Sequence, residues 1–395
     1  MGEVTAIGLG RPRLLFATLM IGLMSQGLAF TAFVAVMPQL ARDFGSGGTF
    51  IAQMTMALAS LGVLAGALTS GSILKQAGTR GTLQCALLVY GLSGISGVLH
   101  HSATLLLASR FLLGFASACT VTVCVWGIAA EYQGHRRTVA LGTAAACGSF
   151  AALFGNLCGA YLASRGGWQL AFVQYPVFAL VGIVLAGLSL KQLRPAPSSA
   201  STPAAPYLAR LMPFYLLTTW LMAVIFMGSS QLPFLLAEQG IVDLAKRSLI
   251  LGSLTAAGTA FSFLYGPLVK RFGPQKTFAF GLLCAVLSLA ALGIDGNALW
   301  ATAGSILLGA LTGIVSPYVY HIVTERSDEG SRGHAIGALN AAIFLGGFLN
   351  PLIFGSLGSV MKLTQVFELT AVVMAGFALI AVTQAVRGSA RVSYR

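Results

Sequence analysis

The chain has 395 residues, of which 56% are hydrophobic and only 8% are charged, and it carries a formal net charge of +13. Soluble domains carry about 25% charged residues. This composition therefore excludes a soluble enzyme, a disordered chain and a disulfide-rich secreted fold, and it predicts an integral membrane protein.

Long stretches without Asp, Glu, Lys or Arg divide the chain into candidate membrane spans. A transmembrane helix needs about 17–25 mostly apolar residues, whereas membrane barrels consist of shorter segments of alternating hydropathy. Twelve charge-free stretches of helical length, rich in Leu, Ala and Gly, predict an all-α polytopic fold with twelve helices. They are residues 14–41, 44–74, 81–109, 111–130, 138–164, 166–190, 211–237, 248–269, 277–294, 296–324, 333–361 and 369–386.

The basic residues are divided unequally between alternate loops. The termini and the even-numbered connections hold 17 Lys and Arg residues, the other connections hold 5, and Arg110 falls within a span. By the positive-inside rule, we predict that both termini are cytoplasmic. The basic residues are scattered in pairs rather than gathered in one patch, so we expect no nucleic-acid partner. Short loops favour a bacterial inner-membrane location, and we expect a monomer in the lipid bilayer.

The chain is predicted to consist of two homologous halves. A Pro-, Ser- and Ala-rich cytoplasmic linker, residues 191–209, separates a six-helix half at 1–190 from another at 210–395. At a constant offset of 195 residues, Gly, Pro, Lys and Arg positions match between the halves, which indicates parallel repeats. The matching segments begin at Pro38 and Pro233, Gly71 and Gly266, Leu112 and Leu307, and Arg137 and Arg332. Such repeats place a binding site at their interface, near the membrane midplane.

One repeated motif resembles the signature of the major facilitator superfamily of secondary transporters, G-x-L-a-D-R-x-G-R-[RK] after the second helix. The resemblance extends over nearly the whole chain. The first copy contains Gly71, Lys75, Gly78 and Arg80, and the second contains Gly266, Lys270 and Gly273. The resemblance implies that the motif's Asp braces the outward-open state. Lys75 and Lys270 stand at that position here, so the gating brace differs from the family's, although Glu131 could pair with Lys75.

Two further signatures are present in part. Arg110 and Gly114 resemble the family's R-x-x-x-G pattern in the fourth helix. The antiporter signature G-P-x-x-G of the fifth helix is approached by Gly155-Asn156-Leu157-Cys158-Gly159, where Asn replaces Pro. This second match favours antiport only weakly.

The resemblance implies that the first, fourth, seventh and tenth helices line a central cavity. Helical spacing then groups polar and aromatic residues on one face of each. The candidate substrate-binding residues are Gln26, Phe30, Arg110, Ser117, Tyr215, Thr219, Gln231, Ser316 and Tyr320. For each residue, packing between helices is the alternative. Together they predict a mostly apolar, aromatic cavity with one cation.

Ionisable residues at membrane depth are functional candidates. The coupling candidates are Arg110, His321 near the cytoplasmic end of the tenth span, and Glu368 near the outer end of the twelfth. Arg110 either contacts an anion or proton pathway, or it hydrogen-bonds to helix-end carbonyls. The alternatives for His321 and Glu368 are an interfacial residue and a solvated helix end. No carboxylate is expected deep in the four cavity-lining helices.

The sequence lacks a catalytic constellation, a C-x-x-C pair and a phosphate-binding G-x-x-x-x-G-K-[ST] loop, so we expect no enzymatic activity, cofactor or metal. The leading hypothesis is proton-coupled efflux of a small amphipathic drug or metabolite by alternating access. Uptake or facilitated transport of an organic anion held by Arg110 is the alternative. A nutrient sensor or a lipid scramblase with the same fold forms a third class.

Overall fold

The computed structural model describes residues 11–99, 102–189, 205–294, 298–328 and 331–392, and every regular element in these ranges is helical. A backbone in lipid must satisfy its own N–H and C=O groups, and helices do so within one segment. Eleven helices in the described ranges are long and apolar enough to cross a membrane. The all-α polytopic fold is therefore confirmed.

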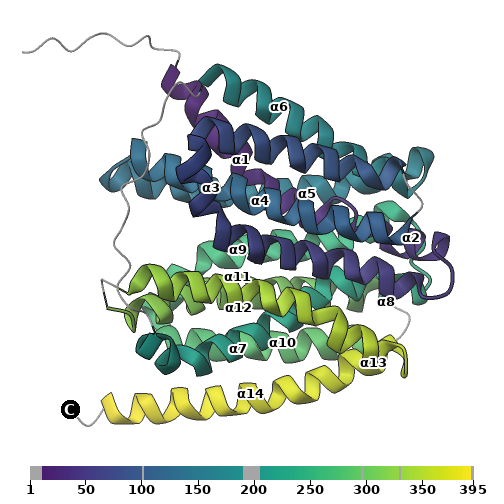
Figure 1. The fold of residues 1–395 in the computed structure, drawn as a ribbon. Coiled ribbons are helices and arrows are strands. Elements are labelled where there is room, and N and C mark those ends of the chain that lie inside the picture. The colour runs from purple at the N-terminus through teal and green to yellow at the C-terminus, as the bar shows by residue number, and fades with distance from the viewer. Residues whose placement is uncertain (1–10, 100–101, 190–204, 295–297, 329–330, 393–395) are drawn as a thin grey trace, which may run out of the picture.

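The N-terminal half, coloured purple to teal in Figure 1, lies beside the C-terminal half, coloured green to yellow. Its elements are α1 (Arg11–Thr31), η1 (Val34–Val36), α2 (Met37–Asp43), α3 (Gly48–Leu99), α4 (Ala103–Glu131), α5 (Gly134–Gly166), η2 (Trp168–Val173) and α6 (Gln174–Ser189). The elements of the second half are α7 (Ala205–Ser230), α8 (Leu232–Glu238), α9 (Leu244–Phe272), α10 (Pro274–Gly293), α11 (Ala298–Glu325), α12 (Arg332–Asn350), η3 (Pro351–Gly355), α13 (Ser356–Gly358) and α14 (Leu363–Val392).

The bundle has two ends, which we name by the chain termini. The start of α1 and the end of α14 lie at one end, the termini face, whereas α2, α8 and α13 lie at the other, the opposite face (Figure 1). Residues 190–204 lie outside the described residues, and α7 already begins at Ala205. The linker at 191–209 therefore stays a prediction.

The helix α3 contains two spans. Its 52 residues would extend about 78 Å at 1.5 Å per residue, far more than the roughly 30 Å of a bilayer core. Gly78 interrupts the helix at φ 68° and ψ 173°, a conformation that residues with a Cβ rarely adopt. Counting the two parts separately, the described residues form the twelve spans that the sequence predicts.

The interruptions of the helices repeat at the offset of 195 residues. The short helices α2 and α8 are related by this offset, and each has Pro in its first turn. Proline is tolerated there because its missing N–H would have no partner within the helix. Gly273, at φ 81°, matches Gly78 at φ 68°. The repeat is thus one of backbone geometry as well as of residues.

One charged residue marks a span boundary wrongly. Arg247, expected in a loop, lies in the first turn of α9. Arg110 lies about two turns into α4, within a span as expected. Both side chains are buried, with 1% and 0% of their surface exposed. A second difference is the first predicted span, which breaks after Thr31 into α1, η1 and α2.

Candidate substrate pathway between the two halves

Two polar side chains join the halves towards the opposite face. Asn156 of α5 donates from Nδ2 to the carbonyl oxygen of Ser248 in α9, at 2.8 Å. Arg247 of α9 donates from Nη1 to the carbonyl oxygen of Ala35 at 3.1 Å, and from Nη2 to that of Ile241 at 2.8 Å. The bond to Ala35 crosses between the halves, so Arg247 holds the two halves together at this face.

The carbonyl of Ala35 is available because of the break between α1 and α2. A helix end leaves carbonyl groups without partners in its own segment. Pro38, three residues after Ala35, has no N–H with which to close a turn onto that oxygen. The planar guanidinium of Arg247 supplies a donor there and another to Ile241. Sequence reasoning missed Arg247, because it treated each charged residue near a span end as a loop residue.

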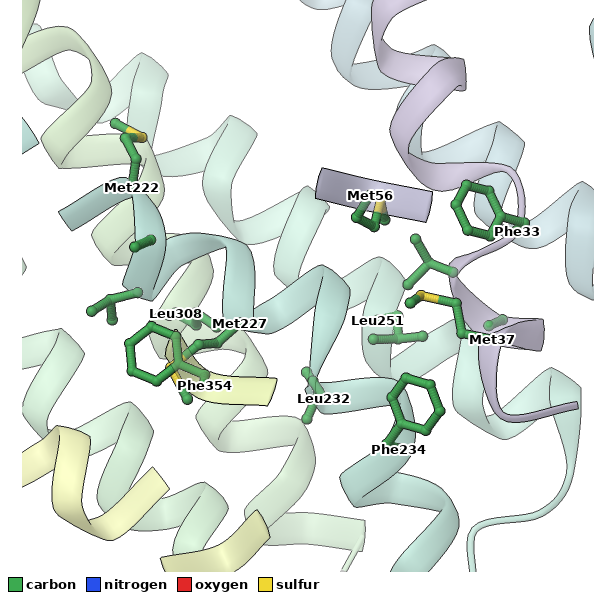
Figure 2. Close-up of a cluster of buried hydrophobic side chains, with 14 of the residues drawn as sticks. Phe33, Met37, Met56, Met222, Met227, Leu232, Phe234, Leu251, Leu308 and Phe354 are labelled. Atoms are coloured by element: carbon green, nitrogen blue, oxygen red, sulfur yellow. The ribbon is translucent and has the colours of Figure 1, made fainter. Parts of the chain in front are cut away.

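An apolar cluster surrounds this closure. Met37 of α2, Phe234 of α8 and Leu251 of α9 belong to one buried core that includes residues of both halves (Figure 2). On the side nearer the midplane, Phe30 of α1 contacts two aromatic rings of the other half. Its centroid lies 5.9 Å from that of Phe226 in an edge-on arrangement, and 6.2 Å from that of Phe344 in a stacked one. These three rings form what we call the aromatic plug.

Space remains between α5 and α9 towards the termini face. Beyond the Asn156–Ser248 bond, a cavity of about 220 Å³ lies between these helices, lined by Phe150, Leu153 and Thr259 among others. Farther along the same two helices, Gly142 and Gly266 are exposed, and a Cβ added at either would meet nothing within 4 Å. The structure is therefore closed at the opposite face, with space between α5 and α9 on the side of the termini face.

The predicted substrate-binding residues fall into two groups. Phe30 lies in the plug, Gln26 is half-buried one turn before it, and Tyr320 is 36% exposed and donates to Asn340 Oδ1 at 2.5 Å. Ser316 is half-buried in α11. These side chains are accessible near the midplane or towards the termini face. Phe344 of α12 was missed, because the resemblance directed attention to four other helices.

Four other predicted residues each lie within one half, and three of them already form hydrogen bonds there. Tyr215 donates to the Ala335 carbonyl at 3.2 Å and Thr219 to the Ala342 carbonyl at 3.1 Å, so both join α7 to α12. Ser117 is buried and donates to the Gly114 carbonyl in its own helix. Gln231 is fully buried, and neither of its amide atoms has a hydrogen-bond partner in the described part of the chain. Substrate contact by these four stays a prediction.

Arg110 lies inside the N-terminal half. Its Nη2 donates to the carbonyl oxygens of Ser93 and Gly94 at 3.2 and 3.3 Å. Its guanidinium carbon lies 4.7 Å from the ring centroid of Phe172 and 5.1 Å from that of Tyr175. Aromatic faces attract cations, and these contacts join α4 to α3, η2 and α6. The geometry matches the hydrogen-bonding alternative, while a role in binding or coupling stays a prediction.

The other two coupling candidates differ in their surroundings. His321 Nε2 lies 3.7 Å from Glu325 Oε2, one turn along α11, and both side chains are largely exposed. Glu368 lies on α14 beside Gly293 of α10, at the periphery of the C-terminal half. All seven carboxylates in the described ranges are exposed, so these ranges contain no buried acidic proton carrier.

The gating motif forms the turns at the termini face. Gly78 and Gly273 supply the positive φ values, and Lys75, Arg80 and Lys270 are exposed. In the ranges that the structure covers, Lys75 forms no ion pair with Glu131 within 4 Å. These ranges also contain no group of three or more His, Cys, Asp or Glu side chains able to hold a metal ion.

Comparison with known proteins gives the same architecture. The family model described as Major Facilitator Superfamily matches residues 19–351 and 232–390. Among solved structures, a point mutant of the nucleoside transporter NupG superposes with a TM-score of 0.72 at 14% identity, covering 94% of this chain and 99% of that one. The D-xylose-proton symporter gives 0.73 at 15% identity, covering 92% and 97%. At these identities the likeness concerns the fold.

Two sequence relatives are similar over smaller parts. The methyl viologen resistance protein SmvA of Salmonella typhimurium is 32% identical over 122 residues, which are 30% of this chain and 25% of that protein. The chain thus matches about a quarter of its length. An uncharacterized transporter of Rickettsia bellii is 24% identical over 282 residues, covering 67% of this chain and 68% of the relative.

Proposed function

The chain belongs to the Major Facilitator Superfamily, and from that premise we propose that it exports small amphipathic molecules in exchange for protons. Secondary transport by a multi-pass membrane protein follows from the family. The finer proposal depends on one observation above all: the residues that meet at the aromatic plug near the midplane are aromatic and uncharged. Phe30, Phe226 and Phe344 offer ring faces, and Gln26 and Tyr320 offer polar edges. The name of the partial relative SmvA is consistent with export.

Alternating access gives these residues a mechanism. With the opposite face closed by Arg247 and Asn156, a molecule reaches the aromatic plug from the termini face. The excess of basic residues in the loops supports a cytoplasmic position for that face, in a bacterial inner membrane. Rocking of the halves then breaks the contacts at the opposite face and releases the molecule there. Ethidium transport into inverted vesicles containing the purified chain tests this direction, and ethidium that moves only the other way contradicts it.

We assign proton coupling to His321, whose imidazole can take up and release a proton. Its Nε2 lies 3.7 Å from Glu325 Oε2. In proteoliposomes, His321→Asn should abolish the acceleration of ethidium transport by a pH gradient while leaving exchange without a gradient intact. The matched control is His334→Asn, which changes an exposed histidine at the start of α12. A full response to the gradient in His321→Asn would place coupling elsewhere.

The alternative, transport of an organic anion, depends on Arg110. Because Arg110 is fully buried and bonded to carbonyls, we expect Arg110→Gln to lower the melting temperature and to leave the KM for ethidium unchanged. The loss of charge-assisted bonds and ring contacts accounts for the lower stability. Transport assays with ethidium and benzoate, combined with thermal melting, check this. Saturable benzoate uptake that disappears in Arg110→Gln at unchanged stability would establish the alternative.

A further inference from the structure

A hollow lies on the opposite face, outside the closure formed by Arg247. Its volume is about 680 Å³, within the range of small-molecule sites. Side chains of both halves line it, among them Arg42, Phe50 and Gln53 from the first half and Phe234, Glu238 and Leu363 from the second. The hollow therefore has its described shape only while the halves are together at this face.

The hollow contains a cation without an acidic partner. Arg42 is exposed and forms no ion pair within 4 Å among the residues that the structure describes. The neighbouring carboxylate is held elsewhere, because Asp43 Oδ2 accepts a hydrogen bond from Trp168 Nε1 at 2.5 Å. A carboxylate on a ligand would form a charge-assisted hydrogen bond with the Arg42 guanidinium.

A second polar group points to the same ligand. Gln53 is only 2% exposed, lines the hollow, and forms no hydrogen bond with any other described residue. Its amide is not fully enclosed, so its N–H can donate to a ligand oxygen that enters the hollow. The absence of Cβ at Gly355 leaves room for Gln53, since a Cβ there would lie 2.3 Å from Gln53 Oε1. Gln53 therefore packs against Gly355 where the two halves meet.

The rest of the lining determines the body of the ligand. Phe50, which is 49% exposed, Phe234 and Leu363 form an apolar wall. Glu238 also borders the hollow, and its carboxylate disfavours a second negative charge on the ligand. We propose that this hollow binds an amphipathic organic monocarboxylate from the opposite face, and that the bound molecule keeps that face closed.

Ligand binding in the hollow affects the conformation of the protein because the lining residues come from both halves. A ligand shifts a conformational equilibrium only through its different affinity for the two states. Arg42 and Gln53 belong to one half and Phe234 and Leu363 to the other, so separation of the halves removes part of the site. The hollow would therefore act as an inhibitory site that is distinct from the aromatic plug.

Binding of 2-naphthoate to the full chain in lipid nanodiscs, measured by equilibrium dialysis against empty nanodiscs, tests the site. We expect saturable binding that weakens about tenfold or more in Arg42→Gln, and that is equally weak for the neutral 2-naphthamide. The matched control is Arg165→Gln, which removes an exposed arginine at the end of α5 that does not line the hollow. Unchanged affinity in Arg42→Gln, or the same loss in both variants, would overturn the assignment.

The conformational part has its own measurement. Ser229 lines a cavity of about 20 Å³ between the halves near the midplane, so a cysteine there reports opening of the opposite face. In a chain whose native cysteines are replaced, 2-naphthoate should slow labelling of Ser229→Cys by an impermeant maleimide, and Arg42→Gln should remove this protection. Faster or unchanged labelling with naphthoate bound would refute the inhibitory role.

Discussion

Replacing Arg247 by Met should open the opposite face and expose the midplane residues from that side. The substitution keeps an apolar stem of similar reach and removes the donors to the carbonyls of Ala35 and Ile241. Hydrogen bonds to charged groups contribute about 1.5–3 kcal/mol, and about 1.4 kcal/mol changes a population tenfold. Because the bond to Ala35 joins the halves, its loss favours the state in which they are apart at this face.

Maleimide labelling of a cysteine at Ser229 measures this shift. We expect the labelling rate in Arg247→Met to rise about tenfold or more over the parent. Lys246→Met is the matched control, since Lys246 carries the same charge in the same turn of α9 and is exposed. Equal labelling in Arg247→Met and the parent, at equal melting temperatures, would show that Arg247 does not hold the face closed.

A carbonyl group is a suitable partner for Arg247, because the contact between the halves must break in every transport cycle. Pairing Arg247 with a buried carboxylate would take a second ion out of water each time this face closes, at a cost of several kcal/mol. The Ala35 carbonyl carries no net charge, and Arg247 keeps its bond to Ile241 in its own half. The closure can therefore be reversible without a buried carboxylate.

The spans and the repeat are predictable because lipid imposes them locally. Every backbone group must be satisfied within a helix, so apolar length alone indicates a span. The offset of 195 residues predicts equivalent turns, and Gly78 and Gly273 adopt equivalent positive φ values. Asn156 and Asn350 also join helices, because they donate to the Ser248 and Ala223 carbonyls.

The partners of the site residues were less predictable because they are distant in sequence. The Ala35 carbonyl lies 212 residues from Arg247, and no pattern within α9 indicates that it will be there. Helical spacing correctly places Tyr215 and Thr219 on one face of α7. It does not show that carbonyls of α12 cover that face. Periodicity identifies a face, whereas the neighbour that meets it depends on the tertiary arrangement.

Gly114→Ala should destabilise the N-terminal half. A Cβ at this position would lie 2.0 Å from the carbonyl oxygen of Ala59, where α4 crosses α3. Backbone atoms cannot rotate away, so the helices must separate, and overpacking of this kind costs about 1–3 kcal/mol. Thermal melting of the purified chain should show a lower midpoint. Gly337→Ala, where a Cβ would meet nothing within 4 Å, is the control and should leave the midpoint unchanged or higher, because Ala favours the helix.

The repeat extends this prediction to the other half. Gly309 and Leu254 stand 195 residues after Gly114 and Ala59, and a Cβ at Gly309 would lie 2.3 Å from the Leu254 carbonyl oxygen. Gly309→Ala should therefore lower the midpoint by a similar amount. Because the two crossings lie in different halves without shared partners, the double variant should show the sum of the two losses. A loss much smaller than the sum would mean that the halves unfold separately, each with its own midpoint, rather than as one unit held by the contacts at Arg247 and Asn156. A parent-like midpoint in either single variant would contradict the close crossing itself.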